Sequence, residues 1–166
     1  MRRGTGRPSS CSKAKWPGRW GFAGVFLLLV LVLAPKVGSQ ESCGLNVRDR
    51  SGSAIGKIEA NGAIRDRSGS AIGSFDRGTV RDRSGSAAGR VDSDGTIRSR
   101  SGSSIGRVED NGTLRNRSGT AVGRIDADGT VRTGSGSSAG RFEGYGSGCR
   151  HVAAAYLFFF EPLHDR

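Results

Sequence analysis

Single aliphatic residues recur at fixed positions between Asn46 and Gly146, separated by polar residues and glycines. The repeating unit is 17 residues long, or 16 in the second copy, and the six copies begin at Asn46, Ala63, Thr79, Thr96, Thr113 and Thr130. Such repetition is typical of units that can bury their apolar faces only against one another. The pattern therefore predicts one repeat domain over residues 46–146.

Each copy carries apolar side chains at three positions. The first holds Val47, Ile64, Val80, Ile97, Leu114 and Val131. The second holds Ile55, Ile72, Ala88, Ile105, Val122 and Ala139. The third holds Ile58, Phe75, Val91, Val108, Ile125 and Phe142. Most are β-branched, which favours half-buried strands, and no apolar set recurs at helical spacing. We expect an all-β repeat domain.

Glycine also occupies three positions in each copy. The first set follows serine and indicates a tight turn: Gly52, Gly69, Gly85, Gly102, Gly119 and Gly136. The second mostly follows Asn or Asp, a strong hairpin signal: Gly62, Gly78, Gly95, Gly112, Gly129 and Gly146. The third lies within a strand: Gly56, Gly73, Gly89, Gly106, Gly123 and Gly140. The apolar positions that flank this third set are three residues apart, so a bulge is expected there, turning both inward.

Read from one strand glycine to the next, the chain contains five hairpins and half a unit at each end. The two half units are residues 46–50 and 138–144. Pairing between them would close the hairpins into a radial ring. The fold class predicted is thus all-β, with tandem β-hairpins arranged radially in a closed array.

The segment 147–166 contains the apolar run VAAAYLFFF at residues 152–160. It is too short to span a bilayer as a helix. We expect it to fill the core of the array, as a strand or a plug, because a small domain needs every apolar contact it can bury. A membrane-binding or partner-docking role for this run is the alternative.

The first 39 residues differ from the repeats. A basic head precedes the apolar residues 22–34, and Pro35 ends that run. A positive head followed by 7–15 apolar residues is typical of a secretory signal peptide. We expect residues 1–39 to be a cleaved signal and residues 40–45 a linker, so that the protein is exported. An uncleaved signal anchor, which would tether the chain to the membrane, is the alternative.

Two cysteines, Cys43 and Cys149, bracket the repeats. In an oxidising compartment such a pair can form a disulfide that ties the first element to the last. Two unrelated free thiols are the other interpretation.

The chain has a formal net charge of +11, but residues 45–148 hold 17 Arg and Lys against 12 Asp and Glu. Arginines recur in two columns. The first, our candidate ligand-binding set, holds Arg48, Arg65, Arg81, Arg98, Arg115 and Arg132. The second holds Arg50, Arg67, Arg83, Arg100 and Arg117. Stacked guanidinium groups can bind phosphates, sulfates or acidic glycans. The alternative is a solvated face neutralised by Asp49, Asp66 and Asp82. We expect no nucleic acid partner.

Other motifs are explained by the repeat. Asp-x-Asp-Gly stretches such as 126–129 lack the further ligands of a calcium loop, so we expect no metal and no cofactor. GSSIG and GSSAG match a nucleophile motif, with Ser104 or Ser138 as the nucleophile and His151 and His164 downstream. That motif needs a strand-to-helix turn in a large α/β sheet. A small serine hydrolase is therefore only the rival hypothesis.

Tandem segments such as VGRIDADGTVR at 122–132, followed by AAAYLFFF at 153–160, resemble the bacterial five-fold β-flower proteins. The resemblance covers roughly residues 46–160 and implies a small exported all-β fold with no established activity. We expect a non-enzymatic function, as a structural or binding module of the cell envelope. Its repeated Arg, Ser and Gly surface would meet an anionic polymer or another protein, or the array would only build an oligomer.

Overall fold

The computed structural model describes residues 43–161, and the fold is that of these residues. The expected signal peptide lies outside them, as does the end of the C-terminal segment. The twelve strands are β1 (Leu45–Asp49), β2 (Ala54–Ile58), β3 (Ala63–Asp66), β4 (Ala71–Asp76), β5 (Thr79–Asp82), β6 (Ala87–Val91), β7 (Thr96–Ser99), β8 (Ser104–Val108), β9 (Thr113–Asn116), β10 (Ala121–Ile125), β11 (Thr130–Thr133) and β12 (Ser138–Glu143). A short 3-10 helix, η1 (Ser147–Cys149), leads into the helix α1 (Arg150–Phe159).

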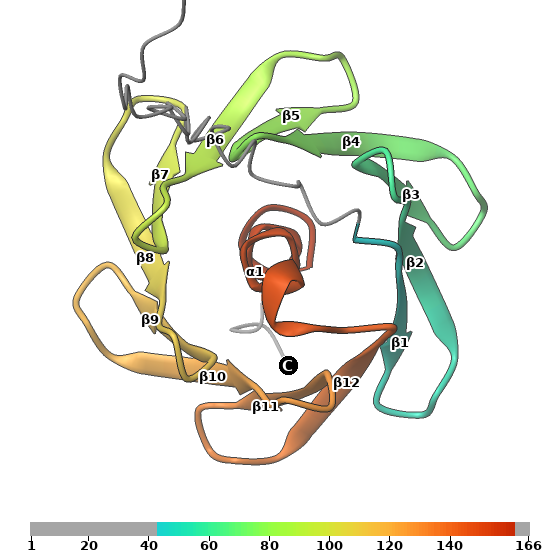
Figure 1. The fold of residues 1–166 in the computed structure, drawn as a ribbon, viewed down its shortest axis with the longest axis vertical. Helices are drawn as coiled ribbons and strands as arrows, with labels where there is room; N and C mark the ends of the chain where they lie inside the picture. Colours follow the sequence, from blue (N-terminus) through green and yellow to red (C-terminus); the bar gives the residue numbers. More distant parts are fainter. Residues whose placement is uncertain (1–42, 162–166) are drawn as a thin grey trace, which may run out of the picture. The chain divides into compact units, whose positions relative to one another are not determined.

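The strands form one closed antiparallel barrel in which each pairs with its neighbours in the sequence. The predicted hairpins are present as β2–β3, β4–β5, β6–β7, β8–β9 and β10–β11. The ring closes where β1 pairs with β12, from Asn46 opposite Glu143 to Asp49 opposite Gly140. Figure 1 looks down the barrel, with α1 at its centre. The all-β radial arrangement and its closure are confirmed.

Four of the five hairpin turns have three-residue loops. In the first, Gly62 donates its N–H to the Glu59 carbonyl at 2.8 Å and has φ of +86°. This geometry, a tight turn followed by a left-handed glycine, is a common hairpin connection. The second copy is one residue shorter, and Arg77 and Gly78 form a two-residue loop with φ of +46° and +83°. The sixth copy departs from the expectation: Gly146 is extended (φ −137°) and caps η1, because the chain leaves the ring after β12.

The other set of turns joins each odd-numbered strand to the next even-numbered one, and we call them the petal turns. They comprise residues 50–52, 67–69, 83–85, 100–102, 117–119 and 134–136. Each ends in a glycine with φ between +81° and +88°. In the first, the carboxylate Oδ1 of Asp49 accepts hydrogen bonds from the Ser51 hydroxyl and from the Ser51 and Ser53 N–H groups. Asp and Ser in turns serve this purpose because their short side chains reach their own backbone.

The expected bulges are present, at the residue before each strand glycine. Val47 lies opposite Gly56 and Arg48 opposite Ala54, so that Ile55 has no partner. The same register shift occurs in the other five pairs joined by petal turns. Apolar residues of the second position are half-buried rather than fully inward, which corrects the expectation for that set. Side chains of the first position are all buried, and those of the third are buried except Phe75.

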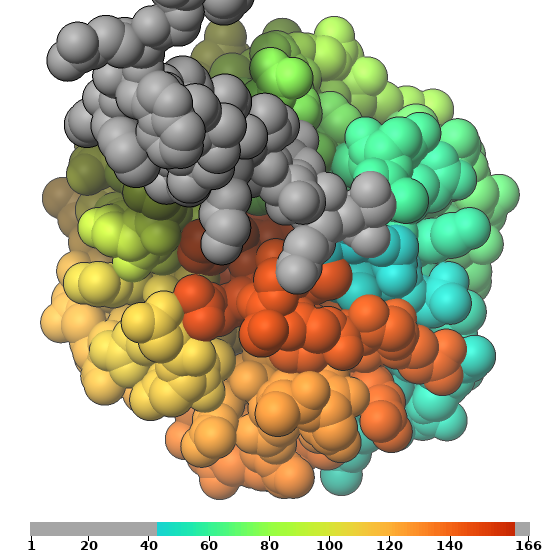
Figure 2. Space-filling view, viewed as in Figure 1, coloured from blue at the N-terminus to red at the C-terminus, as the bar shows by residue number. Residues whose placement is uncertain are grey.

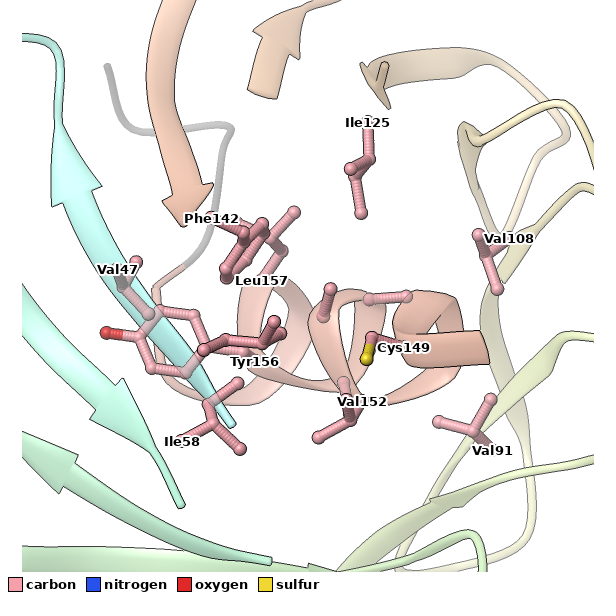
Figure 3. Close-up of a cluster of buried hydrophobic side chains, with 14 of the residues drawn as sticks. Val47, Ile58, Val91, Val108, Ile125, Phe142, Cys149, Val152, Tyr156 and Leu157 are labelled. Carbon is pink, nitrogen blue, oxygen red and sulfur yellow. The ribbon is translucent and has the colours of Figure 1, made fainter. Parts of the chain in front are cut away.

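The core of the barrel is α1. Its residues Val152–Leu157 are buried, and the aliphatics of the surrounding strands converge on them (Figure 3). The run 152–160 is thus a helical plug, and the strand alternative is wrong. Alanine is the strongest helix former, and Ala153, Ala154 and Ala155 let the helix backbone approach the wall of the barrel. Among the described residues, no helix is long and apolar enough to cross a membrane.

Aromatic rings at the end of α1 explain the strand glycines. A Cβ atom on Gly56 would lie 2.6 Å from the Tyr156 hydroxyl oxygen. Three more glycines face phenylalanine rings in the same way, so that an added Cβ would come within 3.0 Å of the ring. The pairs are Gly106 with Phe158, Gly89 with Phe159, and Gly73 with Phe160. Tyr156 also packs edge-on against Phe142, with ring centroids 5.9 Å apart. Each of these glycines leaves room on its strand for one ring of the plug.

Cys43 and Cys149 form a disulfide, with Cα atoms 5.5 Å apart and a sequence separation of 106 residues. The bond joins the residues just before β1 to η1, which leads into α1. It therefore ties the first strand of the ring to the plug.

Candidate functional site

Basic residues gather on the outer face of the strands. The first arginine column lies on the odd-numbered strands, and a second set follows the strand glycines on the even-numbered ones. That set is Lys57, Arg90, Arg107, Arg124 and Arg141, with Ser74 at the equivalent position of the second copy. The register places the two sets opposite each other, for example Arg107 opposite Arg115. Together they form what we call the arginine belt. Sequence analysis missed the even-strand set, although a basic residue follows the strand glycine in five of six copies.

Five of the six arginines of the first column are held by two contacts, an ion pair and a hydrogen bond to a petal turn. In Arg115, Nε donates to Glu109 Oε1 at 2.7 Å and Nη1 donates to the Gly119 carbonyl at 2.9 Å. The Glu109 carboxylate therefore raises the pKa of Arg115. The Nη1 contact with the petal turn recurs in all six, at Gly52, Gly69, Gly85, Gly102, Gly119 and Gly136. Each guanidinium thus fixes a petal turn to the barrel wall.

The carboxylates that neutralise this column differ from those expected. They lie six residues earlier, at Glu59, Asp92, Glu109 and Asp126, or across the ring closure at Glu143. Asp49, Asp66 and Asp82 instead accept hydrogen bonds within their own petal turns. Arg81 has no carboxylate within 4.0 Å among the described residues, because the shortened second copy displaces that partner.

Petal-turn hydrogen bonds also hold the aspartates in their charged form. The Ser51 hydroxyl first, and then the Ser53 and Ser51 N–H groups and the charge of Arg67, lower the pKa of Asp49 below 3.8, although burial opposes them. Asp66 and Asp82 behave in the same way. Because the folded pKa lies below the unfolded one, these turns stabilise the chain above pH 3.8 and lose that contribution as the pH falls further.

The second arginine column lies at the tips of the petal turns, and its five side chains are exposed. We call Arg50, Arg67, Arg83, Arg100 and Arg117 the petal arginines. Arg67 donates Nε to the Ala54 carbonyl at 3.2 Å. Within residues 43–161, none of the five forms an ion pair within 4.0 Å. Their guanidinium groups are therefore more available to a ligand than those of the first column.

Residues of the rival hydrolase hypothesis do not come together. Ser104 and Ser138 begin the strands β8 and β12 and are exposed. His151 lies on α1, and its buried Nε2 atom has no hydrogen-bond partner. His164 lies outside the described residues. GSSIG and GSSAG lead into strands rather than into a helix, so neither forms the turn that a serine nucleophile requires.

The acidic residues of the hairpin turns stabilise the turns themselves. Asp94 Oδ1 accepts the Thr96 N–H, and Asp94 Oδ2 accepts the Thr96 hydroxyl, both at 2.9 Å. These two contacts, the backbone one first, lower the pKa of Asp94. Residues 43–161 contain no cluster of three or more His, Cys, Asp or Glu side chains that could hold a metal ion.

Comparison with known proteins adds one finding. Residues 44–160 match the family described as 5-fold beta-flower protein. Neither the curated proteins nor the solved structures gave a match. The matched range begins just before β1 and ends just after α1, so it contains the whole ring and its plug. The chain belongs to the family of 5-fold beta-flower proteins.

Proposed function

We propose that this protein is an exported, non-enzymatic binding module whose petal arginines hold an anionic polymer of the cell envelope, such as a sulfated or phosphorylated glycan. The observation that supports this most is the repetition, at equivalent positions of five petal turns, of an exposed guanidinium that forms no ion pair within residues 43–161. A polymer with regularly spaced anionic groups can contact several such arginines at once, which multiplies the affinity of each weak contact.

The arginine belt has a supporting role in this proposal. Its odd-strand members, which are the arginines of the first column, are partly exposed, with about 38–47% of the side chain accessible in the five that pair with carboxylates. Their Nε and Nη1 atoms are already engaged, so they position the petal turns and add positive potential. Bidentate recognition of a phosphate or sulfate then falls to the exposed guanidinium groups of the petal arginines.

Export is supported by two features. The N-terminal residues have the composition of a signal peptide, and Cys43 and Cys149 are joined in a disulfide. Disulfides persist in oxidising compartments, which include the periplasm and the cell surface. A periplasmic, outer-envelope or secreted location fits both features.

Binding can be tested on columns of immobilised heparin and in solution with polyphosphate of defined length. The full chain should bind and should elute with salt, because counterions are released when arginines neutralise the polymer. Replacing all five petal arginines by glutamine should weaken binding at least tenfold and flatten the salt dependence.

A matched control removes five charges elsewhere. The variant with Lys57, Arg90, Arg107, Arg124 and Arg141 replaced by glutamine has the same net charge as the petal variant, so it should keep more of the binding. Equal losses in the two variants would mean that only net charge matters. Failure of the full chain to bind either polyanion, or labelling by a serine-directed phosphonate that Ser138→Ala abolishes, would overturn the proposal.

A further inference from the structure

A cavity of about 660 Å³ opens at the end of the barrel where the hairpin turns lie. Its walls are the β2–β3 turn, the β4–β5 turn and the start of α1, with Cys43 of the disulfide at its edge. Figure 2 views the molecule from this end, with the chain around η1 at the centre of the face. A cavity of this size is within the range of about 300–1,000 Å³ that small-molecule sites occupy.

The irregular second copy lies at this cavity. The β4–β5 loop is one residue shorter than the other hairpin loops, and its residues Asp76, Arg77 and Gly78 line the opening. Phe75, just before that loop, is half-buried, whereas its five equivalents in the other copies are buried. The deletion therefore coincides with an opening in the rim and with an aromatic ring that the core does not fully cover.

One part of the lining is apolar. Ile58, Val91 and Val152 contribute buried aliphatic groups, and Phe75 contributes its ring. These residues come from three different strands and from α1, so they surround a space rather than form a flat patch. Such a surface fits a compact apolar group about the size of one or two rings.

The polar lining is rich in uncommitted hydrogen-bond donors. The Arg77 side chain is 83% exposed, and its Nε is 4.0 Å from the nearest carboxylate, Asp76 Oδ1. Within residues 43–161, the Asn61 amide nitrogen and the Ser93 hydroxyl donate no hydrogen bond. The Glu59 carboxylate is occupied by Arg65 at 3.0 Å. Among the residues described, Arg77 and Asp76 form only this long, exposed ion pair with each other, so the Arg77 guanidinium still has N–H groups to offer a ligand.

We propose that this cavity is a binding site for a small molecule with an apolar, ring-sized body and a single anionic oxygen group, such as a carboxylate or sulfonate. The body would lie against Phe75 and Val152, and the anionic group would accept hydrogen bonds from Arg77 and from Asn61 or Ser93. Arginine suits this role because its planar guanidinium donates two parallel hydrogen bonds to such an oxyanion. The site is separate from the petal arginines and does not depend on polymer binding.

Naphthalene-1-sulfonate is a suitable probe, because it combines two fused rings with one anionic group. Its binding to the full chain can be measured by titration calorimetry and by proton NMR of the histidine rings. The chain has only two histidines, so His151 at the cavity wall can be followed against His164 in the tail. The probe should shift the His151 signals in a saturable way and leave those of His164 unchanged.

Two variants test the two halves of the proposal. Arg77→Ala should raise the dissociation constant about tenfold or more, whereas Arg107→Ala removes the same charge from the barrel wall and should leave it unchanged. Insertion of one aspartate between Arg77 and Gly78 restores the three-residue loop of the other copies, so the chain should still fold. It should abolish binding by closing the opening.

Any one of three results would overturn the proposal. The first is that the probe causes no saturable shift of the His151 NMR signals. The second is that Arg77→Ala and Arg107→Ala weaken probe binding equally, and the third is that a folded insertion variant binds the probe with unchanged affinity. Retained circular dichroism and thermal unfolding show that each variant is folded. Because no petal arginine is altered, failure here leaves the polymer-binding proposal standing, and the reverse also holds.

Discussion

The contacts between aromatic rings and strand glycines show how single residues fit the plug to the ring. The sequence predicts a bulge at these glycines, because the pattern of a single strand carries no sign of the rings that pack against it. The closer reason is that Gly56, Gly73, Gly89 and Gly106 face rings of α1 with no room for a side chain. A glycine in a strand often marks such a close approach, but the sequence does not say of what.

Gly106→Ala tests this fit. The added methyl group would meet the Phe158 ring and, 2.6 Å away, the Arg115 carbonyl oxygen. Overpacking of this kind destabilises by about 1–3 kcal/mol. Chemical denaturation should show that loss. Gly146→Ala is the matched control, because its new methyl group meets nothing within 4 Å and its φ of −137° suits any residue. Equal stability of the two variants would contradict the described packing.

The protonation of His151 provides a second test at the scale of single residues, through the pH dependence of stability. Burial first, and then the positive charge of Arg150, lowers the pKa of His151 below 6.5, while the negative charges of Asp110 and Asp94 oppose this effect. The unfolded chain therefore takes up this proton at a higher pH than the folded chain, so stability should fall as the pH drops below 6.5. Melting temperatures between pH 8 and pH 5 measure the effect. His151→Gln should reduce the slope, and an unchanged slope would exclude this histidine as its cause.

At the scale of elements, the repeat predicted the strands and most turns, because every copy restates the same alternation and the same glycines. The C-terminal run was harder to assign. Nine apolar residues fit a buried strand or a buried helix equally well by periodicity. The structure resolves this through Ala153–Ala155, which favour a helix. The partners of the first arginine column were also missed, since they depend on a turn geometry that places residue 109 beside residue 115.

The disulfide should matter because it joins two elements that are distant in sequence. Closing a loop of 106 residues stabilises a protein by about 4–5 kcal/mol in the chain-entropy treatment. The double variant Cys43→Ser with Cys149→Ser should therefore unfold at markedly lower denaturant concentration. Reduction of the natural chain should lower its stability by a similar amount and leave the double variant unaffected. A reductant effect of equal size on both would assign it to something other than this bond.

At the scale of the whole molecule, pairing of β1 with β12 closes the repeats into a barrel and leaves neither end strand unpaired. An open array would expose the edges of β1 and β12, and such edges invite aggregation. Closure removes both edges, and the plug fills the interior, which the short strands alone would leave empty. The six copies are joined by only five hairpin turns. The pairing of β1 with β12, which no hairpin turn connects, takes the place of a sixth hairpin and completes the ring. This closure could be predicted from the two half units, whereas the cavity at the irregular copy could not.

Hydrogen exchange of the backbone amides, measured residue by residue by NMR, tests the closed ring most directly. If β1 and β12 pair, their hydrogen-bonded amides exchange as slowly as those of β6 and β7 on the far side of the barrel. Rapid exchange throughout β1 and β12, beside protected central strands, would mean that the repeats form an open array and would contradict this account.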